Sequence, residues 1–378
     1  MKNIDVLNIE EEIEKCINDT NEQDLNVLIQ EIQRGHYPNV LSKAKAFREK
    51  YQDNGPLIHT LWKVSAISHA ELEEFKQAKE IISDLYYEDV DDTIEDLVIL
   101  GQLAFMCDYK LARRIMSAVI TKAEAAQEMD PDVISGVYLI LGETEENLDK
   151  PKRALKYYKR GLDLLDKKDE TENYINVFLA FKIGMLHTTL NEQEDALTYL
   201  KLALEYSGDS VPQLKINSLV GIGQIYASLD KGAKGYPYLQ EALDMLPGSP
   251  LQGHPVHMDA LVEMGYHHYS EKQYEKAVVM YEQAIQMYTA SQNTIPRKLG
   301  MMYMQYAYCL ANQENPQPLP ASKNFENAIL QLEKEDDIEL LHSALNDVIA
   351  FFERIGNKRK QQYFEKKMLE LAERANAQ

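Results

Sequence analysis

Small residues recur through the middle of this chain at a spacing of about 40 residues, and this repeat limits the possible folds more than any other feature. Each unit opens with a small residue and has a second small residue 12 positions later, a large apolar residue at position 16 and a third small residue at position 19. Four units in a row open at Gly142, Gly184, Gly223 and Gly265, with looser copies at Ala66 and Ala307. Self-similarity of this kind predicts a repeat array in which each unit packs on its neighbours.

Each unit is predicted to be a pair of antiparallel helices. Around Gly265, apolar residues recur three or four positions apart in two segments, and the polar stretch 270–273 separates them. Small residues at positions 0 and 12 would allow the two helices to approach closely. The large residue at position 16 is expected to fill the space between one hairpin and the next. Because no long segment alternates apolar and polar residues between turns, the fold is predicted to be all-α.

The pattern resembles the tetratricopeptide repeat, whose motif has a bulky residue, then Leu-Gly, an aromatic residue, Ala, a second aromatic residue and Ala. The fullest match is Gly265, Tyr274, Ala277, Tyr281 and Ala284. Other copies match at Trp62, Ala66, Phe75 and Ala78, at Leu141, Gly142, Ala154 and Tyr158, and at Gly223, Tyr226 and Ala242. The resemblance covers about residues 57 to 330, and the units exceed the usual length of about 34 residues. Such long repeats are similar to those of bacterial peptide-pheromone receptors and of kinesin light chains.

This resemblance implies an α-solenoid, a right-handed superhelix of about eight or nine helix hairpins. We expect three parts: an N-terminal helical cap at 1–55, with helices near 24–34 and 39–51, the repeat array at 56–335, and a capping hairpin at 336–378. The last hairpin is predicted to break at Gly356-Asn357 and to continue into a basic helix. Terminal units need a polar outer face because no neighbour covers them, so this basic stretch is interpreted mainly as a solvated cap.

Composition excludes several classes of function. Acidic residues (61) outnumber basic ones (40), and a net charge of −21 repels the phosphate backbone of nucleic acids. The apolar stretches are too short to span a bilayer. Three cysteines far apart in sequence are typical of a reduced, cytoplasmic protein rather than of a disulfide scaffold. The Lys-, Asn- and acid-rich composition would suit a low-GC Gram-positive bacterium.

The sequence offers no convincing catalytic or metal site. Glycines lie at packing positions, and no phosphate-binding loop is present. Four histidines cluster in sequence near Glu263, but the first two flank a proline and the last two are adjacent, so we interpret all four as loop or surface residues: His254, His257, His267 and His268. We therefore expect no enzyme activity, no metal and no cofactor.

An acidic run covers residues 88–96. Without a central glycine it does not fit a calcium loop. Asp91 or Asp92 is predicted to cap a helix that begins near Thr93, where carboxylates are favourable. Contact with a basic partner is the alternative.

In the tetratricopeptide family the first helix of each hairpin lines a concave inner face, which implies inward side chains at −6, −3, −2, +1, +4 and +5 from the opening small residue. The predicted partner-binding residues are Phe178, Phe181, Lys182, Asn217, Gln224, Glu263, Tyr266, Gln305 and Tyr308. The same offsets give Asp259, Tyr269, Met301, Met304 and Asn312. Amides can hydrogen-bond an extended backbone, and tyrosine and methionine supply adaptable contact area. Tyr266 and Tyr308 occupy equivalent positions in successive units, whereas Met302 and Tyr306 are predicted to be core.

Three hypotheses for function follow. The first is a non-catalytic repeat protein that binds a peptide or an extended protein segment in its groove, between about Phe178 and Asn312. The second is a peptide-regulated response-regulator phosphatase or sequestering factor, for which acceleration of response-regulator dephosphorylation would be the test. The third is a structural scaffold in a larger assembly. Chaperone-tail binding is not expected, because Lys63 fits the carboxylate-gripping pattern but Ile67 replaces its asparagine. The oligomeric state and the identity of the partner stay open.

Overall fold

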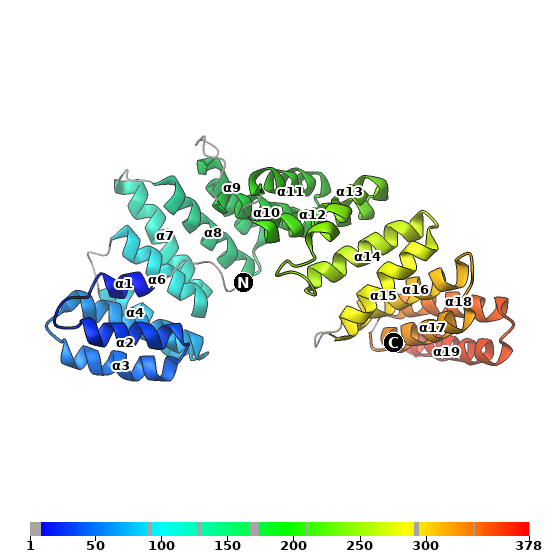
Figure 1. Cartoon of the computed structure of the whole chain (residues 1–378), viewed down its shortest axis with the longest axis horizontal. Helices are drawn as coiled ribbons and strands as arrows, with labels where there is room; N and C mark the ends of the chain where they lie inside the picture. The colour runs from blue at the N-terminus through cyan, green and yellow to red at the C-terminus, as the bar shows by residue number, and fades with distance from the viewer. Residues whose placement is uncertain are drawn as a thin grey trace. The chain divides into compact units, whose positions relative to one another are not determined.

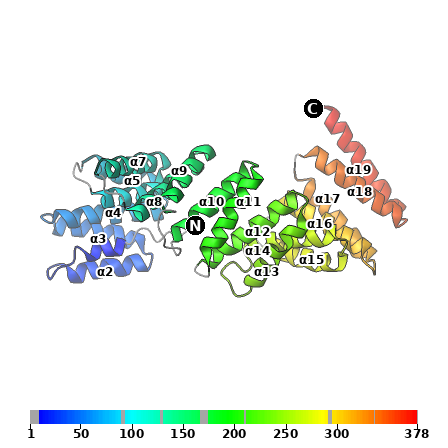
Figure 2. The same ribbon diagram turned by 90° about the horizontal axis from the view of Figure 1, so that it is seen from above.

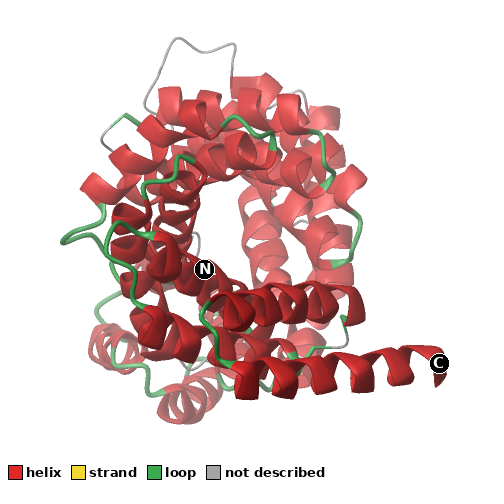
Figure 3. Cartoon of the chain, turned by 90° about the vertical axis from the view of Figure 1, so that its right-hand side faces the viewer, coloured by secondary structure: helices red, strands yellow, loops and turns green. Residues whose placement is uncertain are grey.

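The computed structural model describes residues 9–88, 93–126, 130–165, 174–208, 211–290, 295–335 and 337–377. These residues form nineteen α-helices and no strand (Figure 3). The chain divides into two units, residues 1–186 and 187–378. Within the described residues no helix is long and apolar enough to cross a membrane.

The first unit is built from helices in consecutive order (Figures 1 and 2). Its helices are α1 (Ile9–Glu14), α2 (Glu22–Gln33), α3 (Tyr37–Lys50), α4 (Gly55–Glu71), α5 (Phe75–Glu88), α6 (Ile94–Cys107), α7 (Tyr109–Ala126), α8 (Pro131–Asn147), α9 (Pro151–Leu165) and most of α10 (Tyr174–Thr189). The pairs α4/α5, α6/α7 and α8/α9 are hairpins, and the first helices α4, α6 and α8 contact one another in turn.

The second unit is also built from helix pairs. Its helices are α11 (Gln193–Ser207), α12 (Pro212–Ser228), α13 (Gly232–Met245), α14 (Pro255–Ser270), α15 (Tyr274–Ala290), α16 (Pro296–Asn312), α17 (Pro318–Leu332), α18 (Ile338–Arg354) and α19 (Lys358–Ala377). The first helices α12, α14 and α16 again lie against one another. The prediction of an all-α solenoid of about eight or nine helix hairpins is confirmed: apart from α1, the described helices follow one another as nine pairs.

The small opening residue lies under the large residue at position 16 of its own hairpin. A Cβ atom on Gly142 would lie 2.1 Å from Cε1 of Tyr158, and one on Gly223 would lie 2.4 Å from Cδ2 of Leu239. We predicted that the large residue at position 16 fills the space between one hairpin and the next; its side chain also packs inside its own hairpin. The glycine makes room for this side chain inside the hairpin, which lets the two helices pack closely.

Five hairpin turns contain a left-handed residue seven positions after the opening small residue. These residues have φ between 55° and 60° and are Glu73, Asp149, Asn191, Asp230 and Lys272. In each turn the next N–H donates to a carbonyl five residues earlier at 2.8 Å, as from Gln273 to His268. This is the Schellman arrangement, which satisfies the free carbonyls at the end of the first helix.

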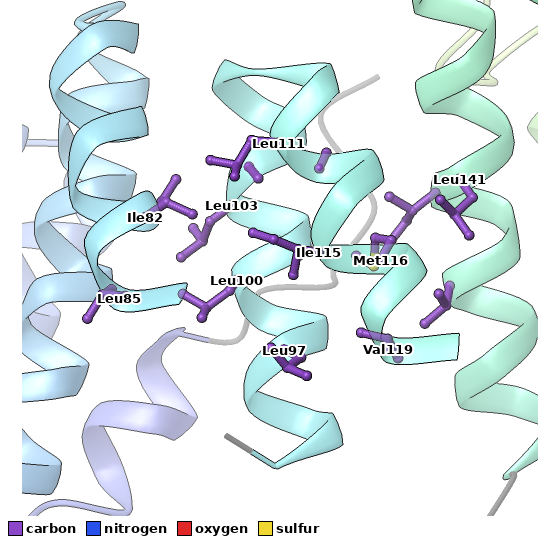
Figure 4. Close-up of a cluster of buried hydrophobic side chains, with 14 of the residues drawn as sticks. Ile82, Leu85, Leu97, Leu100, Leu103, Leu111, Ile115, Met116, Val119 and Leu141 are labelled. Carbon is purple, nitrogen blue, oxygen red and sulfur yellow. The ribbon is translucent and has the colours of Figure 1, made fainter. Parts of the chain in front are cut away.

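Buried apolar side chains from neighbouring hairpins share one core. In the first unit, side chains from α5, α6, α7 and α8 point toward one another (Figure 4). The labelled residues are Ile82, Leu85, Leu97, Leu100, Leu103, Leu111, Ile115, Met116, Val119 and Leu141. This continuous packing between hairpins is what stabilises a repeat array, because no single hairpin can bury its apolar face alone.

The ends of the chain match several local predictions. Helices expected near 24–34 and 39–51 are α2 and α3, and the last hairpin turns at Gly356, which has φ of 71°. The boundaries at 55 and 335 stay predictions. Helix α6 is capped by Thr93, whose side chain accepts a hydrogen bond from the backbone N–H of Asp96. The cap predicted at Asp91 or Asp92 was therefore wrong, and both residues lie outside the described part of the chain.

Candidate functional site

The predicted contact residues fall in both units. Phe178, Phe181 and Lys182 lie on the part of α10 that belongs to the first unit. The other six lie in the second unit, on the adjacent helices α12, α14 and α16. We call the surface formed by these three helices the first-helix face.

In the first unit, Lys182 is already paired with carboxylates of α8. Its ammonium lies 3.0 Å from Oε1 of Glu143 and 3.1 Å from Oε2 of Glu146, and Tyr158 also donates to Glu146. Burial alone would lower the pKa of Lys182, but the two carboxylates outweigh burial and raise it. Glu143 is only 1% exposed. The lysine is thus a charged link between α8 and α10.

The aromatic residues beside Lys182 are only partly accessible. Phe178 is half-buried and its ring centroid lies 4.6 Å from that of Tyr174. Phe181 is also half-buried. These two side chains leave part of their apolar surface open to a partner.

Four tyrosines form a continuous patch in the second unit. The ring of Tyr269 lies 6.2 Å from Tyr266, 5.3 Å from Tyr308 and 6.3 Å from Tyr274, measured between centroids. Tyr266 and Tyr308 are 36% and 41% exposed, whereas Tyr269 and Tyr274 are half-buried. Burial raises the pKa of Tyr269. The two tyrosines predicted from their equivalent positions are therefore joined through Tyr269, and we call these four residues the tyrosine patch.

A polar group lies next to this patch. Burial, with the nearby charge of Asp259, raises the pKa of Glu263 on α14, and the side chain of Gln224 on α12 opposes this shift. Lys298 of α16 pairs with Asp259. Polar contacts therefore connect all three helices of the first-helix face.

The remaining inward positions differ in accessibility. Asn217 and Gln305 are half-buried, and Met301 is 37% exposed. Met304 is buried in the core, so its predicted place on the surface was wrong. Asn312 accepts from Arg354 at 3.0 Å and donates to the carbonyl of Tyr308 at 2.7 Å. Met302, as predicted, is core at 1% exposure, and Tyr306 is half-buried.

Three histidines make side-chain contacts across hairpin turns. Nδ1 of His69, His187 and His268 contacts a side chain five residues later across the turn, at distances of 2.6, 2.5 and 3.1 Å. His268 is only 7% exposed, so its interpretation as a surface or loop residue was wrong.

One of these turns groups three potential metal ligands: His187, Glu192 and Asp195. The four histidines near Glu263 form no such group in the described parts of the chain. Because the His187–Glu192 contact repeats a pairing found at other turns, it is explained by hairpin geometry without a metal.

The ammonium group of Lys63 is paired with two carboxylates of this chain. It is 1% exposed, and its ammonium lies 2.8 Å from Asp96 and 3.6 Å from Glu12 of α1. The side chain that could grip a partner's carboxylate therefore binds internal ones.

Three residues that form these contacts were not predicted from the sequence: Glu143 and Glu146, which pair with Lys182, and Tyr274 of the tyrosine patch. Glu143 and Glu146 lie at offsets +1 and +4 from Gly142, so the offset rule would have found them had it been applied to that unit. Tyr274 belongs to a second helix, where the rule does not apply. Its aromatic motif position was the available signal.

Comparison with known proteins supports the fold. No protein-family model and no curated protein matches the sequence. The apo form of RapI is similar over 95% of this chain and 99% of that one, with 14% identity and a TM-score of 0.62. The apo quorum sensor NprR from B. thuringiensis is similar over 96% of this chain and 98% of that one (13% identity, TM-score 0.54).

A third similar structure is a signal transduction ATPase with a tetratricopeptide repeat sensor from Pyrococcus horikoshii. It covers 88% of this chain and 52% of that one, with 17% identity and a TM-score of 0.54. At these identities the likeness shows the fold alone: a tetratricopeptide-like fold with long repeats, similar to that of RapI and NprR.

Proposed function

We propose that this chain is a non-catalytic repeat protein that binds a peptide or an extended protein segment on the first-helix face of the second unit. The observation that carries the proposal is the tyrosine patch. It places two exposed rings, Tyr266 and Tyr308, in one patch on adjacent helices. Tyrosine combines a large apolar contact area with low side-chain entropy and a polar end, which favours protein recognition.

The polar residues beside the patch suit an extended backbone. Gln224 and Gln305 are half-buried amides that can donate to and accept from peptide groups. A segment lying across α12, α14 and α16 would meet these amides and the tyrosines together. Half-burial limits the number of side-chain rotamers that must be fixed on binding, which reduces the entropic cost.

The names of two similar structures support a role in sensing. NprR is described as a quorum sensor, and the archaeal ATPase as carrying a tetratricopeptide repeat sensor. Both share this chain's fold. We therefore favour a partner that acts as a signal over a permanent scaffold component.

Alanine substitution tests the proposal directly. A partner is first identified by pull-down and mass spectrometry, and its affinity is then measured for Tyr266→Ala and Tyr308→Ala. Removing a central aromatic anchor costs about 2 kcal/mol or more, so each change should weaken binding at least about 30-fold. Val279→Ala, at a 47% exposed position on α15, is the matched control and should bind normally. Unchanged affinity in both tyrosine variants, with normal circular dichroism, would overturn the proposal.

A further inference from the structure

A cavity of about 260 Å³ lies in the second unit, between the α12–α13 turn and the C-terminal half of α14. Its walls include Asp230, Lys231 and Gly232 from the turn and Glu263, Tyr266 and His267 from α14. Drug-sized ligands generally occupy 300–1,000 Å³, so this volume suits one side chain rather than a whole ligand. Tyr266 belongs to both the cavity wall and the tyrosine patch, so the cavity is continuous with the proposed binding surface.

The cavity wall contains one half-buried carboxyl group, that of Glu263, which can accept hydrogen bonds from a ligand. Nδ1 of His267 is buried beneath the α12–α13 turn and is not open to the cavity. A ligand that supplies N–H groups to the carboxyl group would replace the water it loses by burial.

The charge of the wall is negative. Asp230, Glu263 and Glu271 line the cavity, against one basic residue, Lys231. Gly232 of the turn packs against the histidine, because a Cβ atom there would lie 3.3 Å from Nδ1 of His267. The cavity therefore favours a cation with several donors.

We propose that this cavity receives the guanidinium group of an arginine carried by the segment that binds the first-helix face. A guanidinium has five N–H donors in one plane, so it can donate two parallel hydrogen bonds to the Glu263 carboxylate, whereas an ammonium is a point charge. Its flat face can also lie against the ring of Tyr266. This inference rests on the proposed function for the source of the arginine, but the cavity's chemistry can be tested without a partner.

The test uses the full chain and three small probes: N-acetyl-arginine methylamide, its lysine analogue and its citrulline analogue. Citrulline has nearly the same shape as arginine but no charge. Binding is measured by saturation-transfer difference NMR over a concentration series. We expect saturable binding of the arginine probe, with the citrulline probe at least about 10-fold weaker and the lysine probe in between. Equal binding of the arginine and citrulline probes to the unaltered chain would overturn the inference.

Variants locate the site. Glu263→Gln should weaken the arginine probe about 10-fold while leaving the citrulline probe unchanged. Glu282→Gln, at an exposed position on α15 outside the cavity, is the matched control and should change neither. Loss of arginine binding in both variants, or in neither, would contradict the assignment to this cavity.

The outcomes separate the two proposals. If the arginine probe fails to discriminate but Tyr308→Ala still abolishes partner binding, only the arginine assignment is wrong. If the probe behaves as expected but the tyrosine variants bind the partner normally, the cavity stands and the proposed binding face is wrong.

Discussion

Replacing Gly142 by alanine should destabilise the first unit, although alanine is ordinarily the better helix former. The added methyl group would lie 2.1 Å from Cε1 and 2.4 Å from Cδ1 of Tyr158. Tyr158 is fully buried and donates a hydrogen bond to Glu146, so its ring has little freedom to move away. Either the ring or the helix pair must shift.

The magnitude follows from two opposing effects. Overpacking a close-packed core costs about 1–3 kcal/mol, and the depth of this overlap points to the upper part of that range. The helix-propensity gain of alanine over glycine returns about 1 kcal/mol. We therefore expect a net loss of about 1–2 kcal/mol.

Two further variants provide the controls. Gly136 lies in the same helix, but a Cβ atom there would meet nothing closer than Cδ1 of Ile175 at 3.9 Å, so Gly136→Ala should stabilise the unit by about 0.5–1 kcal/mol. Adding Tyr158→Ile to Gly142→Ala should restore part of the loss, because the Ala66 and Ile82 pair occupies the same two positions in another hairpin.

The assay is urea unfolding followed by circular dichroism, with the transition midpoints of the variants compared. Stability in repeat arrays is distributed over neighbouring units, so midpoints are safer than a single global free energy. If Gly142→Ala proves as stable as the unaltered chain, or if Gly136→Ala is equally destabilising, the packing argument is wrong.

Three other predictions concern stability. Lys272→Gly should raise the free energy of unfolding by about 1 kcal/mol, since φ at this position is 58° and glycine adopts this conformation without a steric penalty. Urea midpoints measure the change, and a lower midpoint in the variant would contradict this prediction. Lys63→Met should destabilise the first unit by about 2–4 kcal/mol by leaving Asp96 without its buried partner. Burial would raise the pKa of Asp96, but Lys63 outweighs burial and holds this pKa below its usual range. The pair therefore stabilises the fold above about pH 4, and this stabilisation is lost as the pH falls through the lowered pKa. Unfolding measured as a function of pH should lose this part of its acid dependence in the variant, and an unchanged profile would count against the pairing. Trp62 is the only tryptophan, so its fluorescence should report unfolding of the first unit. The Arg48 guanidinium lies 3.8 Å from the centroid of its ring, so Arg48→Met should shift the emission and lower the free energy of unfolding by about 1 kcal/mol. An unchanged emission spectrum would exclude the stacking.

The sequence predicted the hairpins because close helix packing requires small residues at fixed offsets, and that requirement is visible as a periodicity. Tyr266 and Tyr308 were found for the same reason, since equivalent offsets in adjacent repeats lie on neighbouring helices. Accessibility was harder to predict. Met304 lies at one of the inward offsets but is buried, because an offset gives the side of the helix on which a residue lies and not how deeply its neighbours cover it.

Interactions between repeats were largely beyond sequence reasoning. Lys182 is paired with Glu143, and nothing in either segment alone identifies its partner. At five turns the left-handed position carries Glu, Asp, Asn or Lys rather than glycine, so the usual sequence signal for such a conformation is missing there, whereas Gly356 supplies it at the last turn. The cavity beside Glu263 exists because the α12–α13 turn lies close to α14. The residue spacing within one repeat does not predict how closely the next hairpin approaches.

The most direct test of the central claim is site-specific photocrosslinking in living cells. The photoreactive residue benzoylphenylalanine is placed either at position 308, on the first-helix face, or at position 279, exposed on α15. If the chain works by holding a segment on the first-helix face, position 308 should yield a discrete adduct that maps to one short stretch of one partner, and position 279 should yield none. Adducts of equal yield at both positions, or an adduct at 279 alone, would contradict it.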